Sequence, residues 1–180
     1  RRAAQLRAVR DDLTVTELRG NVDTRLIRLA EGRYDAIVIA AAGLERLGRL
    51  DAAGALLDEL VPAPGQGTIA LEARDGDDAA AAAAAAVTNA ATWCCLAAER
   101  ALVRGLDASC HTPLGAHARI VGGATLVLES FVGLPDGSAW LRDRVAGPAT
   151  DPEALGAEAA QRLLAAGARD LLDRAEAGAG

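Results

Sequence analysis

The first half of the chain shows hydrophobic spacings typical of helices, interrupted by short apolar runs. The positions of Leu6 and Val9 predict a helix over residues 1–10. Asn21 can cap a second helix through its side-chain oxygen, and Gly32 is expected to end it. A third helix is expected further on, over the amphipathic segment Leu50–Leu60.

Segments rich in β-branched and aliphatic residues lie between these helical patterns. We expect strands over Leu13–Leu18, Asp35–Ala42 and Thr68–Ala73, and the second is apolar enough to be buried on both faces. Helices that alternate with buried strands predict an α/β layer with a parallel sheet. The segment Pro62–Gly67 breaks this regularity and predicts a crossing loop.

The second half of the chain begins with helical patterns and then changes to a period of two. The alanine run Ala79–Ala86 and the segment Thr92–Leu106 predict two helices. Strands are then expected over Ala116–Val121, Ala124–Val132 and Ala139–Val145, followed by a helix from Pro152 to about Ala175. This order predicts a small α+β domain with a three-stranded antiparallel sheet.

Composition and charge limit the classes of function. The 180 residues are 51% hydrophobic but only 2% aromatic, so alanine, leucine and valine must fill the core. A net charge of −6 argues against a general nucleic-acid binder. All 19 basic residues are arginine, and ten of them lie in residues 1–50 beside seven acidic residues. This local excess of positive charge favours an anion site on an otherwise acidic protein.

The three cysteines do not form the pattern of a disulfide framework. Cys94 and Cys95 are adjacent and the total is odd, so we expect a reducing, cytoplasmic location. Neither a signal peptide nor an apolar run long enough to span a bilayer is expected. Cys94, Cys95, Cys110 and His111 could supply four zinc ligands, but adjacent helical cysteines point in different directions, so we expect no metal.

Several arginines lie in predicted loops or at the start of predicted elements, where guanidinium groups can bind carboxylates through two parallel hydrogen bonds. The candidates are Arg1, Arg2, Arg19, Arg25 and Arg46. They could equally be solvated surface residues. The glycines around Gln66 lack the lysine of a phosphate-binding loop, and instead allow a sharp turn or close approach to a ligand.

Cys110 lies in a predicted turn between a helix and a strand. A thiol there could act as a nucleophile or a covalent anchor, or it could be a small buried apolar group. The adjacent His111 could be a base or ligand, or an exposed turn residue.

Taken together, these motifs resemble the porphobilinogen deaminase (hydroxymethylbilane synthase) family. The resemblance covers nearly the whole chain, and its motifs occur in the family's order. The matching segments are Arg1–Leu6, Leu18–Leu26, Tyr34–Ile37, Ala42–Gly48, Pro64–Gly67, Ala98–Ala101, and Cys110 followed by Pro113.

The resemblance implies three domains, two of them α/β lobes of the periplasmic-binding-protein type that flank a cleft. Residues 1–62 would form most of the second lobe, and residues 63–90 would be the crossover and a remnant of the first lobe. Residues 91–180 would form the C-terminal α+β domain that carries the cofactor cysteine. The rest of the first lobe would precede this chain.

The resemblance also implies a transferase of tetrapyrrole biosynthesis. Cys110 would hold a dipyrromethane through a thioether, and on this primer four porphobilinogen units would be joined into hydroxymethylbilane with release of ammonia. Arg1, Arg2, Arg19, Arg25 and Arg46 would bind the cofactor's carboxylates. The last three, together with Gln66, would also bind substrate.

The family's catalytic aspartate would lie in the first lobe, so the resemblance assigns no catalytic residue to this chain. Alone, the chain is expected to be inactive, whereas the full-length enzyme is expected to be monomeric, without nucleic-acid or membrane partners. Ala108 and Ser109 replace the two glycines that the family usually has before its cysteine. Two alternatives remain, a non-catalytic carboxylate-binding module of the periplasmic-binding-protein type and a structural remnant without a ligand.

Overall fold

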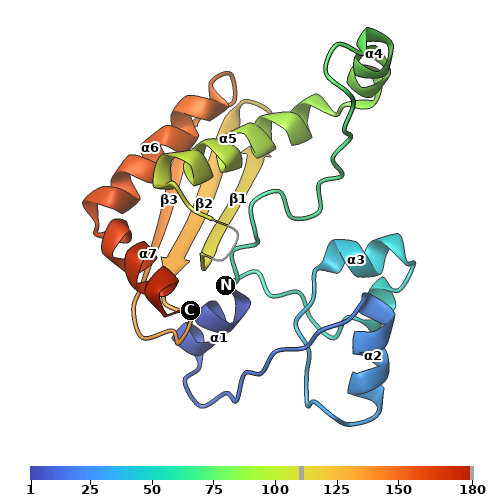
Figure 1. Ribbon diagram of the computed structural model, residues 1–180, viewed down its shortest axis with the longest axis vertical. Coiled ribbons are helices and arrows are strands. Elements are labelled where there is room, and N and C mark those ends of the chain that lie inside the picture. The colour runs from blue at the N-terminus through green and yellow to red at the C-terminus, as the bar shows by residue number, and fades with distance from the viewer. Residues whose placement is uncertain (110–111, 179–180) are drawn as a thin grey trace.

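The computed structural model describes residues 1–109 and 112–178. The elements follow one another as α1 (Arg2–Val9), α2 (Val22–Ala30), α3 (Ala41–Arg46), the 3₁₀ turn η1 (Leu50–Ala52), α4 (Asp78–Val87), α5 (Ala90–Leu106), β1 (Leu114–Val121), β2 (Thr125–Gly133), β3 (Trp140–Pro148), α6 (Pro152–Ala165) and α7 (Ala168–Ala177). The sheet and its covering helices lie at one end of the molecule, and α2 and α3 lie at the other (Figure 1).

The three strands form one antiparallel sheet in the order β1-β2-β3. Leu114 pairs with Val132 at one end of the first hairpin, and Val121 pairs with Thr125 at the other. The second hairpin turns around Gly137, whose positive φ of 78° suits a residue without a side chain. The predicted α+β domain with a three-stranded antiparallel sheet is therefore confirmed, with strand ends shifted by a few residues.

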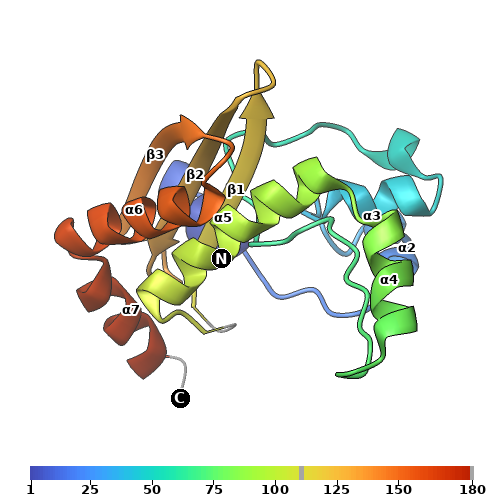
Figure 2. The same ribbon diagram turned by 90° about the horizontal axis from the view of Figure 1, so that it is seen from above.

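The main core lies between one face of the sheet and helices α5, α6 and α7 (Figures 1 and 2). Leu126, Leu128 and Val132 alternate along β2 toward these helices, as a half-covered antiparallel strand requires. Leu102 of α5 and Leu163 of α6 are fully buried against them. The core is thus aliphatic, as the low aromatic content predicts.

Helix α1 packs on the opposite face of the sheet (Figure 2). Phe131, which alternates with the core residues of β2, forms a small second cluster there with Ala4 and Val61. Val61 also lies so close to Gly115 of β1 that a β-carbon on Gly115 would be 2.9 Å from the Val61 backbone oxygen. The sheet therefore fixes both α1 and the segment around Val61.

Backbone N–H groups on the free edge of β1 donate hydrogen bonds to acceptors outside the sheet. The Ala116 N–H donates to the Pro62 carbonyl over 2.9 Å, and the Ala118 N–H donates to the Glu99 carboxylate over 2.8 Å. An unpaired strand edge is a site of unwanted association, so these contacts protect it. They also tie the crossing segment to the C-terminal part of the chain.

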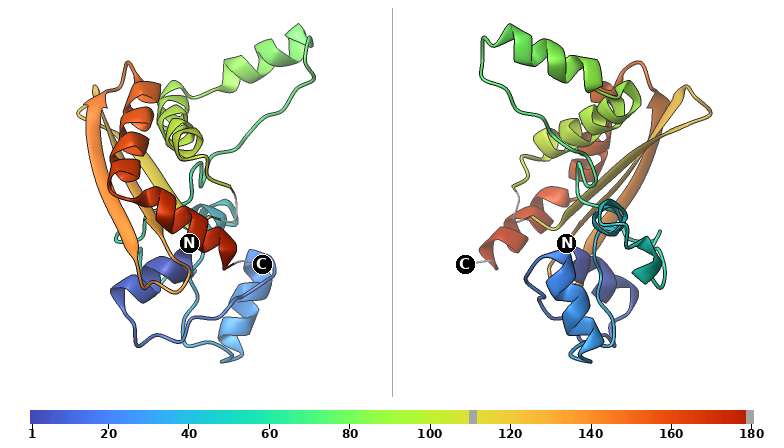
Figure 3. Two further views of the ribbon diagram at one scale, coloured as in Figure 1. Left: turned by 60° about the vertical axis from the view of Figure 1, so that its left-hand side comes forward. Right: turned by 90° about the vertical axis from the view of Figure 1, so that its right-hand side faces the viewer.

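The helices predicted in residues 1–32 are confirmed, and their caps agree with the sequence. Asn21 accepts a hydrogen bond from the Thr24 N–H at the start of α2, as its cap position predicts. Helix α4 contains the alanine run and projects away from the sheet without a buried residue (Figures 1 and 3). Isolated helices of this length gain little from propensity alone, so α4 receives little stabilisation from the rest of the described chain.

The predicted strands over Leu13–Leu18, Asp35–Ala42 and Thr68–Ala73 are wrong for the described chain. Each is extended or turning chain without sheet pairing, and Ala41 begins α3. A buried parallel strand needs hydrogen-bonding neighbours on both edges, and the described residues supply none for these segments. Ile37, Val38 and Ile39 are accordingly only half-buried.

Two helix predictions also need correction. Over Leu50–Leu60 only η1 is helical, because Gly54 weakens the helix and Leu56 and Leu57 remain exposed with nothing to cover them. The C-terminal helix is interrupted by Gly167, whose φ of 99° ends α6 and redirects the chain into α7.

Within the described residues, no individual helix has the length and apolarity needed to cross a bilayer. Helices α4 and α5 meet that criterion only as a pair bent by 104°.

Candidate functional site

Two adjacent arginines at the start of α1 meet the crossing loop through Gln66. The Gln66 Oε1 atom accepts hydrogen bonds from Arg1 over 3.3 Å and from Arg2 over 3.5 Å. Arg1 also donates to the Val61 carbonyl over 3.1 Å, and Arg2 donates to the Val38 carbonyl over 3.5 Å. The structure thus brings together three of the predicted ligand-binding residues.

Helix α1 is held in place by a side chain that imitates backbone pairing. The buried Gln5 amide donates to the Val61 carbonyl over 2.9 Å and accepts from the Val61 N–H over 2.7 Å. At the other end of α1, Arg7 donates to the Pro135 carbonyl over 2.8 Å. These contacts fix the direction in which Arg1 and Arg2 leave the helix.

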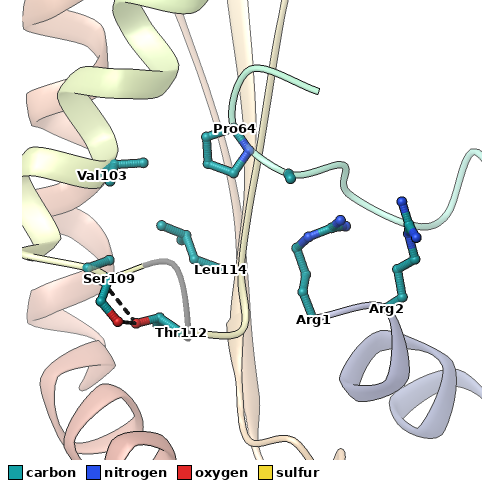
Figure 4. Close-up of a pocket in the computed structure, with 9 residues that line it drawn as sticks. Arg1, Arg2, Pro64, Val103, Ser109, Thr112 and Leu114 are labelled. Carbon is teal, nitrogen blue, oxygen red and sulfur yellow. Dashed lines mark hydrogen bonds between the residues drawn. The ribbon is translucent and has the colours of Figure 1, made fainter. Parts of the chain in front are cut away.

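The two arginines border a cavity of about 700 Å³ between α1, the crossing loop, α5 and β1 (Figure 4). Its lining comprises Arg1, Arg2, Ala63, Pro64, Val103, Ala108, Ser109, Thr112 and Leu114. Ser109 and Thr112 lie on the side opposite the arginines, and their hydroxyl oxygens are 3.3 Å apart. In the sequence they flank positions 110 and 111. The proposed anchor Cys110 and its neighbour His111 themselves lie outside the described residues.

The cavity has a strongly cationic side. Burial lowers the pKa of Arg1 to about 10, and repulsion from Arg2 adds to this effect. Burial also lowers the pKa of Arg2, with a further contribution from Arg25. Among the described residues no carboxylate forms an ion pair with Arg1 or Arg2. Both guanidinium groups stay protonated at neutral pH, so their charge is available to an anionic ligand.

The other predicted arginines are placed unequally. Arg46 donates to the Gly67 carbonyl, next to Gln66, and Arg25 is near enough to Arg2 to affect its pKa. Arg19 instead pairs with Glu17 over 3.1 Å, and its side chain is 84% exposed. The structure therefore places Arg1, Arg2 and Arg46 at the crossing loop and Arg25 near Arg2. Of the five arginines, Arg1 and Arg2 line the cavity, whereas Arg19, Arg25 and Arg46 do not.

Comparison with known proteins assigns both sides of this cavity to one family. Residues 1–82 match the family model described as porphobilinogen deaminase, dipyromethane cofactor binding domain. Residues 93–165 match the model of the porphobilinogen deaminase C-terminal domain. The chain belongs to the porphobilinogen deaminase family. Arg1, Arg2 and Pro64 come from the first match, whereas Val103, Ser109 and Leu114 come from the second.

Individual relatives agree with this assignment. The chain is 51% identical over 175 residues to the porphobilinogen deaminase of Thiobacillus denitrificans, 45% identical over 174 residues to that of Thermus thermophilus, and 48% identical over 174 residues to that of Roseiflexus castenholzii. Each alignment covers 96% of this chain but only 57% or 58% of the relative. The chain therefore spans less than three fifths of the length of the porphobilinogen deaminases that it matches.

Two buried polar residues in this porphobilinogen deaminase family member were not predicted to serve the site. Gln5 fixes α1, and Glu99 connects α5 to the crossing loop and to β1. The available signal was a polar residue on an otherwise apolar helix face, since Glu99 follows Cys95 and Ala98 on the stripe that continues to Leu102. The spacing shows that such a residue is buried, but not which backbone groups it bonds.

The two substitutions before position 110 are compatible with the backbone. Among the described residues, Asp107 is the only non-glycine with a positive φ, at 52°, where it ends α5. Ala108 and Ser109 do not adopt that conformation, so their β-carbons cause no backbone strain.

Among the described residues, no group of three or more His, Cys, Asp or Glu side chains could hold a metal ion. Cys94 donates to the Ala149 carbonyl over 3.2 Å, and burial raises the pKa of the Cys95 thiol. Both are half-buried packing residues of α5, and neither lines the cavity.

Proposed function

We propose that this chain is the part of a hydroxymethylbilane synthase that holds the dipyrromethane primer and the growing pyrrole chain. In the natural polypeptide, the enzyme would join porphobilinogen units with release of ammonia in tetrapyrrole biosynthesis. Family membership supports the chemistry, and the cationic cavity supports the role of this chain within it.

One observation carries the proposal. Two half-buried guanidinium groups, without an acidic partner among the described residues, face a cavity whose opposite side flanks position 110. Burying like charges together is unfavourable unless a ligand neutralises them. Pyrroles with acetate and propionate arms are carboxylate-rich ligands that would do so.

The residues present fit a dipyrromethane. Arg1 and Arg2 would bind its carboxylates, and Val103, Pro64 and Leu114 would contact its apolar rings. Cys110 would hold it through a thioether, and the bound group would supply the pyrrole carbon that receives each new unit. Ser109 and Thr112, beside that position, offer hydroxyl groups for orienting it.

The remaining arginines would bind the later units. Arg46 bonds the Gly67 carbonyl beside Gln66, and Arg25 lies near Arg2, so carboxylates beyond the first two rings would reach them next. Each charge-assisted hydrogen bond to a carboxylate contributes about 1.5–3 kcal/mol. Arg19 is outside the cavity lining, and we propose that it serves only when a longer chain extends past Arg25.

The larger architecture follows the same proposal. Residues 1–62 would belong to the second α/β lobe, residues 63–90 would form the crossover and a remnant of the first lobe, and residues 91–180 would form the C-terminal domain. The second lobe would be of the periplasmic-binding-protein type. The protein would act as a cytoplasmic monomer, and the acid/base group would come from the other lobe.

A turnover assay tests this function. The natural polypeptide carrying this sequence is incubated with porphobilinogen, and ammonia and hydroxymethylbilane are measured. We expect one ammonia for each unit added and a linear tetrapyrrole product, whereas residues 1–180 alone should release none. The alternative, a non-catalytic carboxylate-binding module, is favoured if the natural polypeptide binds porphobilinogen stoichiometrically but releases no ammonia.

A further inference from the structure

Glu99 is a buried carboxylate at the junction of three segments. It lies on α5, and only 6% of its surface is exposed. Its Oε2 atom accepts a hydrogen bond from the Gly65 N–H over 2.6 Å, and its Oε1 atom accepts one from the Ala118 N–H over 2.8 Å. One side chain therefore joins the crossing loop, α5 and strand β1.

The geometry requires a carboxylate and not an amide. Two backbone N–H donors approach two different oxygens. The Ala118 bond is buried and the Gly65 bond is partly buried, so losing either is costly. A glutamine in the same position can offer one oxygen only, so its NH₂ group would face a second donor.

Gly65, whose N–H bonds Glu99, is next to the ligand-facing part of the loop. Gly65 immediately precedes Gln66, whose Oε1 atom accepts from both Arg1 and Arg2. The opposite end of the same segment is fixed by Gln5 at Val61. Without the bond to Gly65, the Gln5 contacts at Val61 and the Arg46 bond to the Gly67 carbonyl remain, but the residue directly before Gln66 loses its link to α5. Gln66 can then shift relative to the guanidinium groups.

We propose that Glu99 is a positioning residue of the arginine site. Its ionised carboxylate bonds both Gly65 of the loop and Ala118 of β1, an arrangement called the Glu99 clasp below. The clasp keeps Gln66, Arg1 and Arg2 in one arrangement for a polycarboxylate ligand. This role rests on the proposed function, because it concerns the same site. Glu99 itself does not line the cavity.

The clasp depends on the charge of Glu99. Burial raises the pKa of this carboxyl, and the two backbone hydrogen bonds and His117 oppose that rise. The titratable neighbours are Cys95 on its own helix and His117 on β1, whose Nδ1 atom is 4.0 Å from Oε1. On the loop, its contact is the Gly65 backbone N–H.

The two effects of pH on Glu99 have opposite signs. As the pH falls through its raised pKa, a proton occupies one oxygen, one clasp bond is lost and the site loosens. Between the ordinary carboxyl pKa and the raised one, the folded state binds more protons than the unfolded state, so the free energy of unfolding rises as the pH falls. A positioning role thus predicts weaker binding at acidic pH together with greater stability.

The test compares Glu99→Gln with a matched control, Glu153→Gln, which alters an exposed residue of α6 that pairs with Arg104. In the natural polypeptide, Glu99→Gln should raise KM for porphobilinogen about tenfold, the equivalent of one lost charge-assisted hydrogen bond, with kcat changed less than twofold. It should also remove the part of the acidic limb of kcat/KM that Glu99 contributes. Glu153→Gln should match wild type in both respects.

A second variant, His117→Ala, keeps both hydrogen bonds of Glu99 and changes only the pH at which the Glu99 carboxylate takes up a proton. Protonated His117 favours the charged carboxylate, so its removal should move the acidic limb to higher pH. This surface substitution protects the test against misfolding of Glu99→Gln, because the His117 side chain is 48% exposed. An unchanged limb in His117→Ala, or wild-type KM in a folded Glu99→Gln variant, would overturn the role of Glu99.

Failure of the proposed function gives a different result. If wild type releases no ammonia, the affinity for citrate is measured by calorimetry on the same variants at pH 7.5. A positioning residue still predicts about tenfold weaker citrate binding in Glu99→Gln than in Glu153→Gln. Equal affinities would reject the role of Glu99 independently of any turnover.

Discussion

Replacing Arg1 with glutamine is expected to lower kcat/KM for porphobilinogen by about tenfold to a hundredfold in the natural polypeptide. Arg1 borders the cavity, and its guanidinium charge is only partly solvated and has no acidic partner among the described residues. A ligand carboxylate would form a charge-assisted hydrogen bond with it, and glutamine cannot replace that charge. Steady-state kinetics over a range of porphobilinogen concentrations measures the effect.

The matched control for this prediction is Arg10→Gln. Arg10 follows the same helix, but it pairs with Asp12 and its side chain is 60% exposed, so its removal should change kcat/KM less than twofold. Arg1→Lys should fall between the two, because lysine keeps the charge but not the planar pair of donors. Equal losses in Arg1→Gln and Arg10→Gln would show that general charge, and not the cavity, attracts the substrate.

Replacing Gly156 with alanine is expected to lower the free energy of unfolding by about 3 kcal/mol. Gly156 lies where α6 crosses α5, and a β-carbon there would be 2.3 Å from the Ala98 carbonyl oxygen and 2.6 Å from the Ala101 side chain. The two helices must move apart to admit it, and this opens the core above β2. Urea denaturation followed by circular dichroism measures the change.

Gly54→Ala is the control for the packing prediction. Gly54 is exposed and makes no helix contact, since a β-carbon there would meet nothing within 4 Å. Its φ is not in the left-handed region, so alanine should alter stability by less than about 0.5 kcal/mol. A stable Gly156→Ala variant would mean that α5 and α6 pack further apart than described.

The C-terminal part was predictable because its determinants are local. The turn around Gly137 separates two strands that pair with each other, and Pro152 follows Asp151, which caps α6 through the Ala154 N–H. Each signal lies within a few residues of the element that it specifies. Only the break at Gly167 was missed, because a single glycine within a helical pattern is often tolerated.

The strands predicted in the first half depend on distant partners. The apolar run Asp35–Ala42 indicates burial, but no short-range feature states which strands should flank it, and the described chain provides none. Leu56 and Leu57 show the same dependence, since their helix would need a surface to cover. Apolar pattern alone therefore predicted more regular structure than forms.

The candidate site was only partly predictable for a similar reason. Arg1, Arg2 and Gln66 were identified from motifs, and the structure brings them together. Gln5 and Glu99 were missed because their partners are backbone groups 56, 34 and 19 positions away. The role predicted for Arg19 stays a prediction, since its side chain pairs locally with Glu17 and does not line the cavity.

The most direct test of the account is the intact mass of the natural polypeptide, purified from a host that makes porphobilinogen. We expect added mass equal to two pyrrole units, located by peptide mapping on Cys110 and absent from Cys110→Ser. The Cys95→Ser variant, altered at a packing residue of α5, should retain the addition. An unmodified Cys110 in active wild-type protein, or the same addition in Cys110→Ser, would contradict the account.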